Sequence, residues 1–448
     1  MKSAKNLRAL RLLHGFCFLA LCCLILLSSA CVASSPGASG QPTPTAGTRT
    51  PQGQGHPPTA SMPPTETSCP AQGTARAAVM PPLMLGKHPM LVYAYNTGSA
   101  ALLKRYNVAS GQKTVILSLP DTAIGSAQIS ADGQWVLFVA HTHGDPPTQH
   151  VLLVRSDGQG LQTLFCGDAY PESALWSPDQ HFLLLWGGVT IGQMRELSVL
   201  NITTGAVQTV LSSSGSVYQP LTWLDNTRVY VSGQVSPIGS AQTPPPDLSL
   251  LDIQKGSEQT DADLQLVTQL APCWSADRSA DSASLFLSTC TRTDAGTSSS
   301  ITEQPATGGS PRVMYQDSQH GVVTVRAVAV NLLLLLIENE TGDVSQNGLW
   351  TMHVDGSGLT RLTVDPSQEK KSQNLGPEQL NAQTQFSWSN ISRDGSMYAL
   401  KTTFKHDNRV SGDEETLLVG SLGGGSPTTF ASTSGDGSEV DIVGWTTM

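Results

Sequence analysis

The chain has 448 residues, a formal net charge of −10 and only 13% charged residues. Phosphate binding needs a basic face, so this acidic balance argues against nucleic acid as a partner. The length is large for one ordinary core but normal for a repeat architecture.

The N-terminus carries the pattern of an export signal. Four basic residues lie within the first eleven positions, and an apolar run of 16 residues from Leu12 to Leu27 follows them. That run is at the low edge of the roughly 17–25 residues that span a bilayer, and the small residues Ser28, Ser29 and Ala30 come next. We predict a cleaved signal peptide over residues 1–30, whose removal takes four positive charges from −10 and leaves −14.

Cys31 follows these small residues directly, and its position resembles the lipobox of bacterial lipoproteins, in which the new N-terminal Cys is lipidated. Lipoproteins usually carry Leu three positions earlier, whereas this chain has Ser28 there and Leu27 one place before it. The resemblance implies lipidation at Cys31 and anchoring to the outer face of a bacterial cytoplasmic membrane. The alternatives are an uncleaved anchor, or ordinary cleavage after Ala30 that gives a secreted or periplasmic protein.

Residues 31–82 are dominated by Pro, Thr, Ser, Gly and Ala and contain almost no large apolar side chains. Such a segment cannot bury enough apolar area to offset its chain entropy. We therefore predict a disordered tether here, with a glycosylated stalk as the alternative use of this composition. The folded domain is expected over residues 83–448.

Beyond Cys31, the exported part contains four cysteines, namely Cys69, Cys166, Cys273 and Cys290. An even number of cysteines in an oxidising compartment predicts disulfides. Cys273 and Cys290 fall on two predicted neighbouring strands, so they are the favoured pair and leave Cys69 with Cys166. Four cysteines allow three connectivities, and buried free thiols are the alternative.

A repeating segment, in which an apolar run, a turn and a second apolar run follow one another, indicates an all-β repeat protein. Five copies begin at Ala127, Ala174, Leu221, Ala271 and Phe386. With a sixth copy at the C-terminus, equivalent positions are spaced by 47, 47, 51, 114 and 57 residues, and 114 corresponds to two repeats. A weaker copy around Val328 fills that gap.

A second recurring unit places two runs of alternating apolar and polar residues around a Gly-containing turn, as at Asp157-Gly158 and Asp355-Gly356. It occurs seven times between the copies of the first unit. The two units together give four short strands in about 50 residues, which is the number of strands and the length typical of a propeller blade.

The two ends of the domain complete each other. The final segment from Val440 to Met448 matches the first strand of a repeat, with Trp445 at the aromatic position, and no second strand follows it. The first repeat, at Met90, lacks that strand. We predict a seven-bladed all-β propeller of four-stranded antiparallel blades, closed by a C-terminal strand that completes the first blade. Five of the eight Trp occupy this inner-strand position and are interpreted as packing between blades.

The turn motifs SADG at Ser130 and SRDG at Ser392, and the segment LWTMHVDGSGLTRLT at Leu349, resemble the TolB-like repeats related to WD-repeat propellers. The resemblance implies the fold and leaves function open, because such propellers serve as docking platforms, as accessory domains of peptidases and as lyase or hydrolase scaffolds. The Asp residues of these turns are expected to cap their own turns.

Chemistry-bearing motifs are scarce. The sequence contains no G-x-S-x-G or H-E-x-x-H motif, and it suggests no cofactor. His141, His143 and Asp145 are weak metal candidates, because two His at alternate positions of an extended segment point the same way. A solvated loop is the favoured reading of these three residues.

The sequence therefore favours a monomeric, non-catalytic binding or scaffold module that presents a propeller face to a protein, peptide or glycan. It would be exported and tethered to the membrane by its N-terminus. The alternative is an exported hydrolase or lyase with its site at the central channel of the propeller.

Overall fold

The computed structural model describes residues 68–76, 86–143, 148–166, 171–187, 195–213, 216–235, 246–255, 258–271, 273–279, 281–293, 296–306, 309–337, 344–364, 378–381, 391–404, 414–434 and 436–447. The predicted signal peptide and Cys31 lie outside these residues. Within the described part, no helix has the length and apolar character that crossing a membrane requires.

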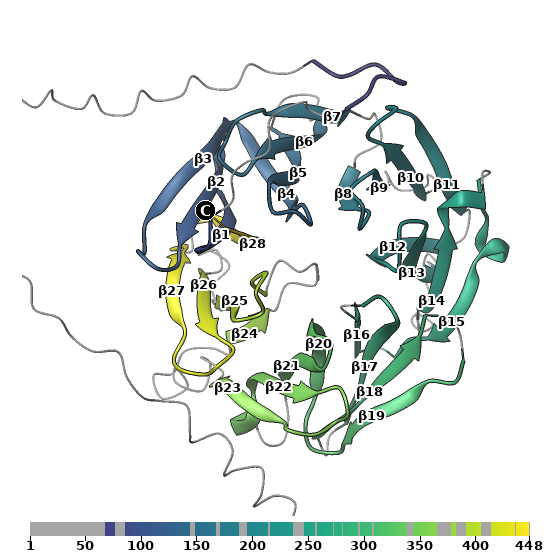
Figure 1. Ribbon diagram of the computed structural model, residues 1–448, viewed down its shortest axis with the longest axis vertical. Coiled ribbons are helices and arrows are strands. Elements are labelled where there is room, and N and C mark those ends of the chain that lie inside the picture. The colour runs from purple at the N-terminus through teal and green to yellow at the C-terminus, as the bar shows by residue number, and fades with distance from the viewer. Residues whose placement is uncertain are drawn as a thin grey trace, which may run out of the picture. The chain divides into compact units, whose positions relative to one another are not determined.

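The described strands form seven four-stranded antiparallel sheets arranged as blades around a centre (Figure 1). Blade 1 contains β28 (Glu439–Thr447), β1 (Pro89–Asn96), β2 (Ala100–Asn107) and β3 (Lys113–Pro120). Blade 2 contains β4 (Thr122–Ile129), β5 (Trp135–Thr142), β6 (Gln149–Arg155) and β7 (Gln162–Cys166). Blade 3 contains β8 (Pro171–Trp176), β9 (Phe182–Gly187), β10 (Arg195–Asn201) and β11 (Val207–Ser213).

The remaining four blades repeat this plan. Blade 4 contains β12 (Ser216–Trp223), β13 (Arg228–Val235), β14 (Asp247–Asp252) and β15 (Gln265–Gln269). Blade 5 contains β16 (Cys273–Arg278), β17 (Ser284–Thr293), β18 (Gly296–Pro305) and β19 (Arg312–Asp317). Blade 6 contains β20 (Val322–Ala329), β21 (Leu332–Ile337), β22 (Gly348–His353) and β23 (Thr360–Val364). Blade 7 contains β24 (Glu378–Asn381), β25 (Met397–Phe404), β26 (Glu414–Ser421) and β27 (Thr428–Ser432).

Helical structure in the described part is limited to three single turns of 3-10 helix, η1 (Ile253–Lys255), η2 (Asp261–Asp263) and η3 (Val344–Gln346). The all-β prediction is therefore confirmed. In blade 7 the innermost described strand is β24, whereas the sequence placed that strand at the copy beginning with Phe386, which lies outside the described residues.

The ring closes between the two ends of the domain. Strand β28 pairs antiparallel with β1, with Trp445 opposite Leu91 in the register. The sheet order β28-β1-β2-β3 makes the last strand of the chain the innermost strand of the first blade. Figure 1 shows β28 beside β1 at the point where the two ends of the colour scale meet. The predicted seven blades and their C-terminal closure are confirmed.

Seven clusters of buried side chains fill the spaces between consecutive blades. The cluster between blades 7 and 1 contains Tyr93, Phe430 and Trp445, and the rings of Tyr106 and Phe430 stack with centroids 4.9 Å apart. Each blade thus buries both of its faces, which explains the near-continuous apolar runs of strands such as β21. The innermost strands are held rigidly around the centre as a result.

The Ser-x-Asp motifs form a repeated turn between the innermost strand and the second strand of a blade. Ser177 Oγ donates to Asp179 Oδ1 at 2.6 Å, and the same carboxylate oxygen accepts the backbone N–H of His181 at 3.1 Å. The backbone N–H of Phe182 donates to Ser177 Oγ at 2.9 Å. Equivalent bonds recur in the turns that begin at Ser130, Ser279 and Ser392. The expected capping role of these Asp residues is confirmed.

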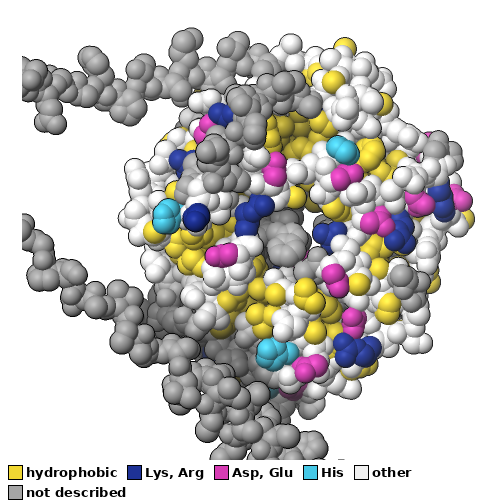
Figure 2. All heavy atoms as spheres, viewed as in Figure 1, with side chains coloured by type: hydrophobic (Ala, Val, Ile, Leu, Met, Phe, Trp, Pro, Cys, Tyr) yellow, Lys and Arg dark blue, Asp and Glu magenta, His cyan; other side chains and the backbone are white. Residues whose placement is uncertain are grey.

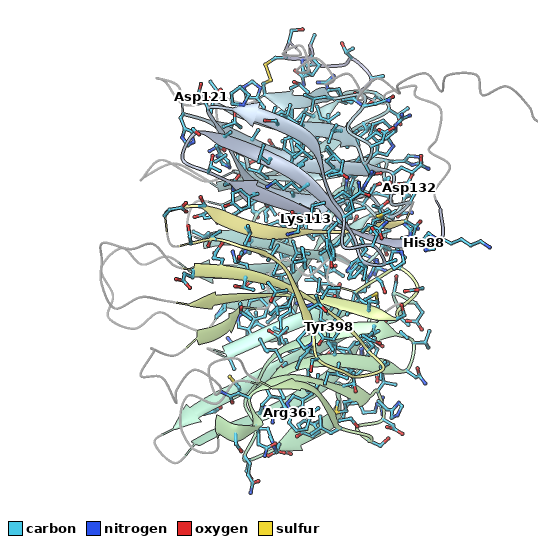
Figure 3. The ribbon with its side chains drawn as sticks, turned by 90° about the vertical axis from the view of Figure 1, so that its left-hand side faces the viewer. His88, Lys113, Asp121, Asp132, Arg361 and Tyr398 are labelled. Atoms are coloured by element: carbon cyan, nitrogen blue, oxygen red, sulfur yellow. A yellow bond between two sulfur atoms is a disulfide. The ribbon has the colours of Figure 1, made fainter. Side chains whose placement is uncertain are left out.

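All these turns lie on one face of the ring, because each joins the first strand of a blade to the second. Figure 3 shows Asp132 on the same side as His88, whereas Asp121, which precedes an innermost strand, lies at the opposite side. Bonds from the turn hydroxyls and backbone lower the pKa of Asp281, first through Ser279, and of Asp394, first through Ser392. We call this side the turn face.

Residues 68–76 lie on the propeller, although the sequence assigned them to the disordered tether of residues 31–82. Gly73 N donates to Gly205 O at 3.0 Å, and Arg76 N donates to Ile202 O at 2.7 Å. The Arg76 side chain is 4% exposed and donates to Leu164 O at 2.8 Å. We call residues 68–76 the strap, which Figure 1 shows at the outer rim near β7.

The strap leaves no apolar pattern in the sequence, because backbone hydrogen bonds, one buried cation and the disulfide between Cys69 and Cys166 hold it. Of these contacts, only the pairing of Cys69 with Cys166 is among the sequence predictions. The close approach of the strap depends on Gly205, whose φ is +72°. A Cβ atom at that position would lie 1.8 Å from Thr74 O, so the contact tolerates no side chain.

Candidate functional site

The innermost strands enclose a central cavity of about 870 Å³, lined by residues of β4, β8, β12, β16, β20 and β28. Its described lining includes the five tryptophans Trp176, Trp186, Trp223, Trp274 and Trp445. Ser, Thr and Gln side chains of the same strands supply hydrogen-bonding groups between them. Figure 2 shows hydrophobic side chains and Lys or Arg side chains close together around the centre of one face.

The tryptophan side chains both pack between blades and line the cavity. Trp223 and Trp445 are 4% and 3% exposed, and Trp176 and Trp274 are half-buried and pack against the clusters between blades. The interpretation of these residues as inter-blade packing therefore holds for the described copies, and each also presents part of its surface to the cavity. The indole N–H groups of Trp176, Trp186 and Trp445 have no hydrogen-bond acceptor among the described residues.

A charged pair joins blades 5 and 6 at the cavity wall. Asp277 of β16 accepts the backbone N–H of Ala327 at 2.9 Å through Oδ2 and that of Arg278 at 2.9 Å through Oδ1. Arg326 of β20 lies beside it and is 4% exposed. Burial raises the pKa of Asp277 and lowers that of Arg326, and the opposite charge of each partner counteracts the shift of the other. The pair therefore compensates two charges that would be costly to bury alone.

A second hollow adjoins the cavity at the turn face. A smaller hollow of about 250 Å³ shares Arg393 and Trp445 with the central cavity and is also lined by Lys87 and Thr446. Thr446 Oγ1 donates to Gly133 O at 2.7 Å, which ties the closing strand to the turn of blade 2. A Cβ atom on Gly133 would lie 2.7 Å from Arg393 Nη1, so the guanidinium reaches over this turn. We call the two adjoining hollows together the central cleft.

The predicted cysteine sites are placed as follows. Cys69 and Cys166 form a disulfide with Cα atoms 5.8 Å apart, which attaches the strap to the end of β7. The register of β16 and β17 sets Cys273 directly opposite Cys290, and Cys290 is buried and disulfide-bonded. Cys31 lies outside the described residues, and its lipidation stays a prediction.

The weak metal candidates lie at the end of β5. His141 is half-buried, and a Cβ atom on Gly125 would lie 2.1 Å from its Nε2 atom, so the ring rests on the backbone of β4. Burial lowers the pKa of His141, and the nearby charge of His143 adds to this. Asp145 lies outside the described residues. His141 and His143 belong to no group of three metal-ligating side chains in the described part of the chain.

The group that does have metal-ligating atoms close together consists of Cys69, Cys166 and His150. His150 Nδ1 lies 3.4 Å from Cys166 Sγ. Both sulfurs are committed to the disulfide, so in this state they are not thiolate ligands.

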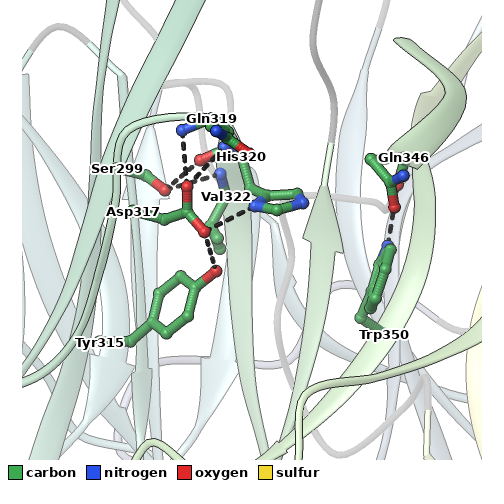
Figure 4. Close-up of polar contacts among 8 residues, drawn as sticks. All are labelled: Ser299, Tyr315, Asp317, Gln319, His320, Val322, Gln346 and Trp350. Atoms are coloured by element: carbon green, nitrogen blue, oxygen red, sulfur yellow. Dashed lines mark hydrogen bonds and ion pairs between the residues drawn. The ribbon is translucent and has the colours of Figure 1, made fainter. Parts of the chain in front are cut away.

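A further polar cluster connects blade 5 to blade 6 (Figure 4). Tyr315 Oη donates to Asp317 Oδ2 at 2.7 Å, and His320 Nδ1 lies 2.6 Å from the same oxygen. Burial raises the pKa of Tyr315 and Asp317 raises it further. The His320 ring meets Trp350 edge-on at 6.1 Å. These residues belong to outer strands and to the connection between the blades, so we assign the cluster a structural role.

Among the charged residues of the central cleft, the sequence singles out only Asp394, as a turn-capping residue. It does not single out Lys87, Asp277, Arg278, Arg326 or Arg393 as site residues. A usable signal existed for one of them, because Arg326 interrupts an otherwise apolar innermost strand, VVTVRAVA. A charge at that position must find a partner or face a cavity.

Comparison with known proteins finds similar structures but no similar sequences. Neither a protein family nor a curated protein matches the sequence. TolB from Acinetobacter baumannii is 14% identical, with a TM-score of 0.40, over 61% of this chain and 65% of that one. TolB from Agrobacterium tumefaciens is 13% identical, with a TM-score of 0.37, over 80% of this chain and 99% of that one. The propeller fold itself rests on the sheet order of this chain.

An enzyme is also among the similar structures. A prolyl endopeptidase is 11% identical, with a TM-score of 0.48, over 79% of this chain and 48% of that one. The chain thus spans less than two thirds of the Acinetobacter TolB and about half of the peptidase. The propeller fold that the TolB-like turn motifs implied is confirmed by the seven blades of the structure, and proteins that share a propeller need not share an activity.

Proposed function

We propose that this propeller is an exported, membrane-tethered binding module that takes a segment of a partner polypeptide into its central cleft, without catalysing a reaction. The observation that carries the proposal is the preformed cavity of about 870 Å³ with tryptophan in its walls. Its volume lies within the roughly 300–1,000 Å³ typical of ligand sites, and its walls combine aromatic surface with a few polar groups.

The composition of the cleft favours a polypeptide over a glycan. Trp and Arg, which dominate the strongest contacts of protein–protein interfaces, occur together in its lining. The walls belong to rigid innermost strands, so a ligand would not have to order them on binding. Export and tethering rest on the signal pattern over residues 1–30 and on Cys31. A tether would hold the propeller near the membrane, where membrane-bound or exported partners are concentrated.

An exported hydrolase or lyase is the second candidate, and one observation favours it. Asp277 has a carboxyl pKa raised by burial and lies in the cavity wall, which is a common setting for an acid or base. Both its oxygens accept backbone N–H groups, and it pairs with Arg326, which equally suits a structural charge pair.

Photo-crosslinking in cells tests the proposed function. A benzophenone amino acid at Thr222, in the cavity wall, is compared with the same residue at Val313, which is 60% exposed on an outer strand. We expect a discrete protein adduct from position 222, which the cavity-filling change of Ser275 to Trp abolishes, and no such adduct from position 313. Adducts that are equal at both positions, or present only at 313, would contradict a central binding site.

A further inference from the structure

The ionisable groups of the central cleft differ in sign from the chain as a whole. The described lining contains Lys87, Arg278, Arg326 and Arg393 as cations and Asp277 and Asp394 as anions, a balance of +2. The whole chain carries −10. Positive charge is thus gathered in the central cleft while the rest of the molecule is acidic.

The two anions of the cleft are already occupied within the protein. Asp394 accepts bonds from Ser392 Oγ at 2.6 Å and Ser396 Oγ at 2.7 Å. Asp277 accepts two backbone N–H groups and pairs with Arg326. A cationic ligand would therefore meet carboxylates whose lone pairs are largely used.

Two of the cations, Lys87 and Arg393, are not occupied in this way. Lys87 and Arg393 are exposed, line the hollow at the turn face and make no ion pair among the described residues. Arg278 is half-buried, lines the central cavity and donates to Leu224 O at 3.3 Å. These three cations all line the central cleft. Fixed cations in a low-dielectric cleft attract anions more strongly than the same groups would on an open surface.

The carboxylates around the opening of the cleft do not remove its preference for anions. The carboxylates of the Ser-x-Asp turns lie on the same face and are negative, yet each is bonded by its own turn. An approaching acidic chain would meet repulsion from the rim and attraction from the cleft, which favours insertion into the cleft over binding across the face.

We propose that the segment bound in the central cleft is acidic, with a carboxylate held between Lys87 and Arg393 and an apolar or aromatic side chain against the tryptophans. This inference rests on the proposed function and specifies its ligand.

The test uses two fluorescent probes with similar aromatic bodies. 1-Anilinonaphthalene-8-sulfonate is anionic, and N-phenyl-1-naphthylamine is neutral. We expect the mature protein to bind the anionic probe about tenfold more tightly. The double change Lys87→Gln and Arg393→Gln should bring the two affinities to within about twofold of each other. The control change Lys113→Gln and Lys255→Gln removes two charges from exposed positions outside the cleft, and it should leave the preference intact.

The outcomes separate the two proposals. If both probes bind, Thr222→Trp weakens both, and the anionic probe shows no preference, the cleft is a binding site and the acidic inference is wrong. If neither probe binds, or Thr222→Trp has no effect on either, the proposed site itself is wrong. A hexapeptide of alternating Trp and Glu should displace the anionic probe better than its Trp and Gln counterpart. Displacement by a uronic-acid tetrasaccharide but by neither peptide would overturn the assignment to a polypeptide.

Discussion

Removing the disulfide between Cys69 and Cys166 should destabilise the propeller strongly, even though the strap itself is short. The bond joins residues separated by 97 positions and therefore closes most of the first two blades into one loop. In the chain-entropy account, a loop of about 100 residues restricts the unfolded chain by about 4.7 kcal/mol. The strap keeps its other contacts, through Gly73 and Arg76, so the native state of the variant should retain the fold.

Urea denaturation of the mature protein, followed by tryptophan fluorescence, measures this effect. Cys69→Ser, Cys166→Ser and the double variant should lose about the same free energy of unfolding, because each removes the same cross-link. Cys290→Ser is the matched comparison. If its partner is Cys273, the loop has 17 residues and the loss should be nearer 3 kcal/mol. A loss below about 1 kcal/mol for Cys69→Ser, or a larger loss for Cys290→Ser, would refute the reasoning.

Further predictions concern ring closure, the strap and the anchor. Lys401→Met should cost about 3–5 kcal/mol of unfolding free energy, because Nζ lies 2.6 Å from Glu415 Oε1 and 2.8 Å from Asp441 Oδ1 and the change removes the cation that these two carboxylates share. Burial lowers the pKa of Lys401, but these carboxylates outweigh it and raise the pKa above 10.5. Its contribution should persist below pH 10.5 and disappear as the pH rises through the raised value, which denaturation in alkaline buffers would reveal. Gly205→Ala should displace the strap and speed protease cleavage within residues 68–76, whereas Gly98→Ala, which has open space around it, should not. Mass spectrometry of the mature N-terminus should find a lipid on Cys31, and an unmodified terminus would contradict lipid anchoring.

The fold was accessible from the sequence because a propeller repeats its own pattern. Seven copies of one hairpin unit and a conspicuous aromatic position gave both the blade count and the closing strand, since Trp445 stands where Trp176 stands in an earlier copy. The turn motifs added the hydrogen bonds, because Ser and Asp two residues apart can cap only a local turn. These features depend on residues close together in the sequence or repeated along it.

The site was less accessible because it is assembled across blades. Asp277 and Arg326 are 49 positions apart and meet only when blade 6 packs against blade 5. Arg393 lines the cleft with its guanidinium over Gly133 of blade 2, a contact between distant parts of the chain. No single repeat contains this information. The strap was hidden for a similar reason, since Arg76 finds its acceptors on blades that follow it by about 90 and 125 positions.

The strand that closes the ring, β28, also forms part of the central cleft. The closing strand β28 contributes Trp445 and Thr446 to the cleft, and Thr446 bonds to the turn of blade 2 over which Arg393 lies. Lys401 of blade 7 fixes the same strand through Asp441. Loss of the closing strand would therefore remove one wall of the cleft and the support beneath its exposed cations together. It follows that Lys401→Met should weaken binding of the anionic probe at urea concentrations well below those that unfold the blades, although Lys401 does not line the cleft.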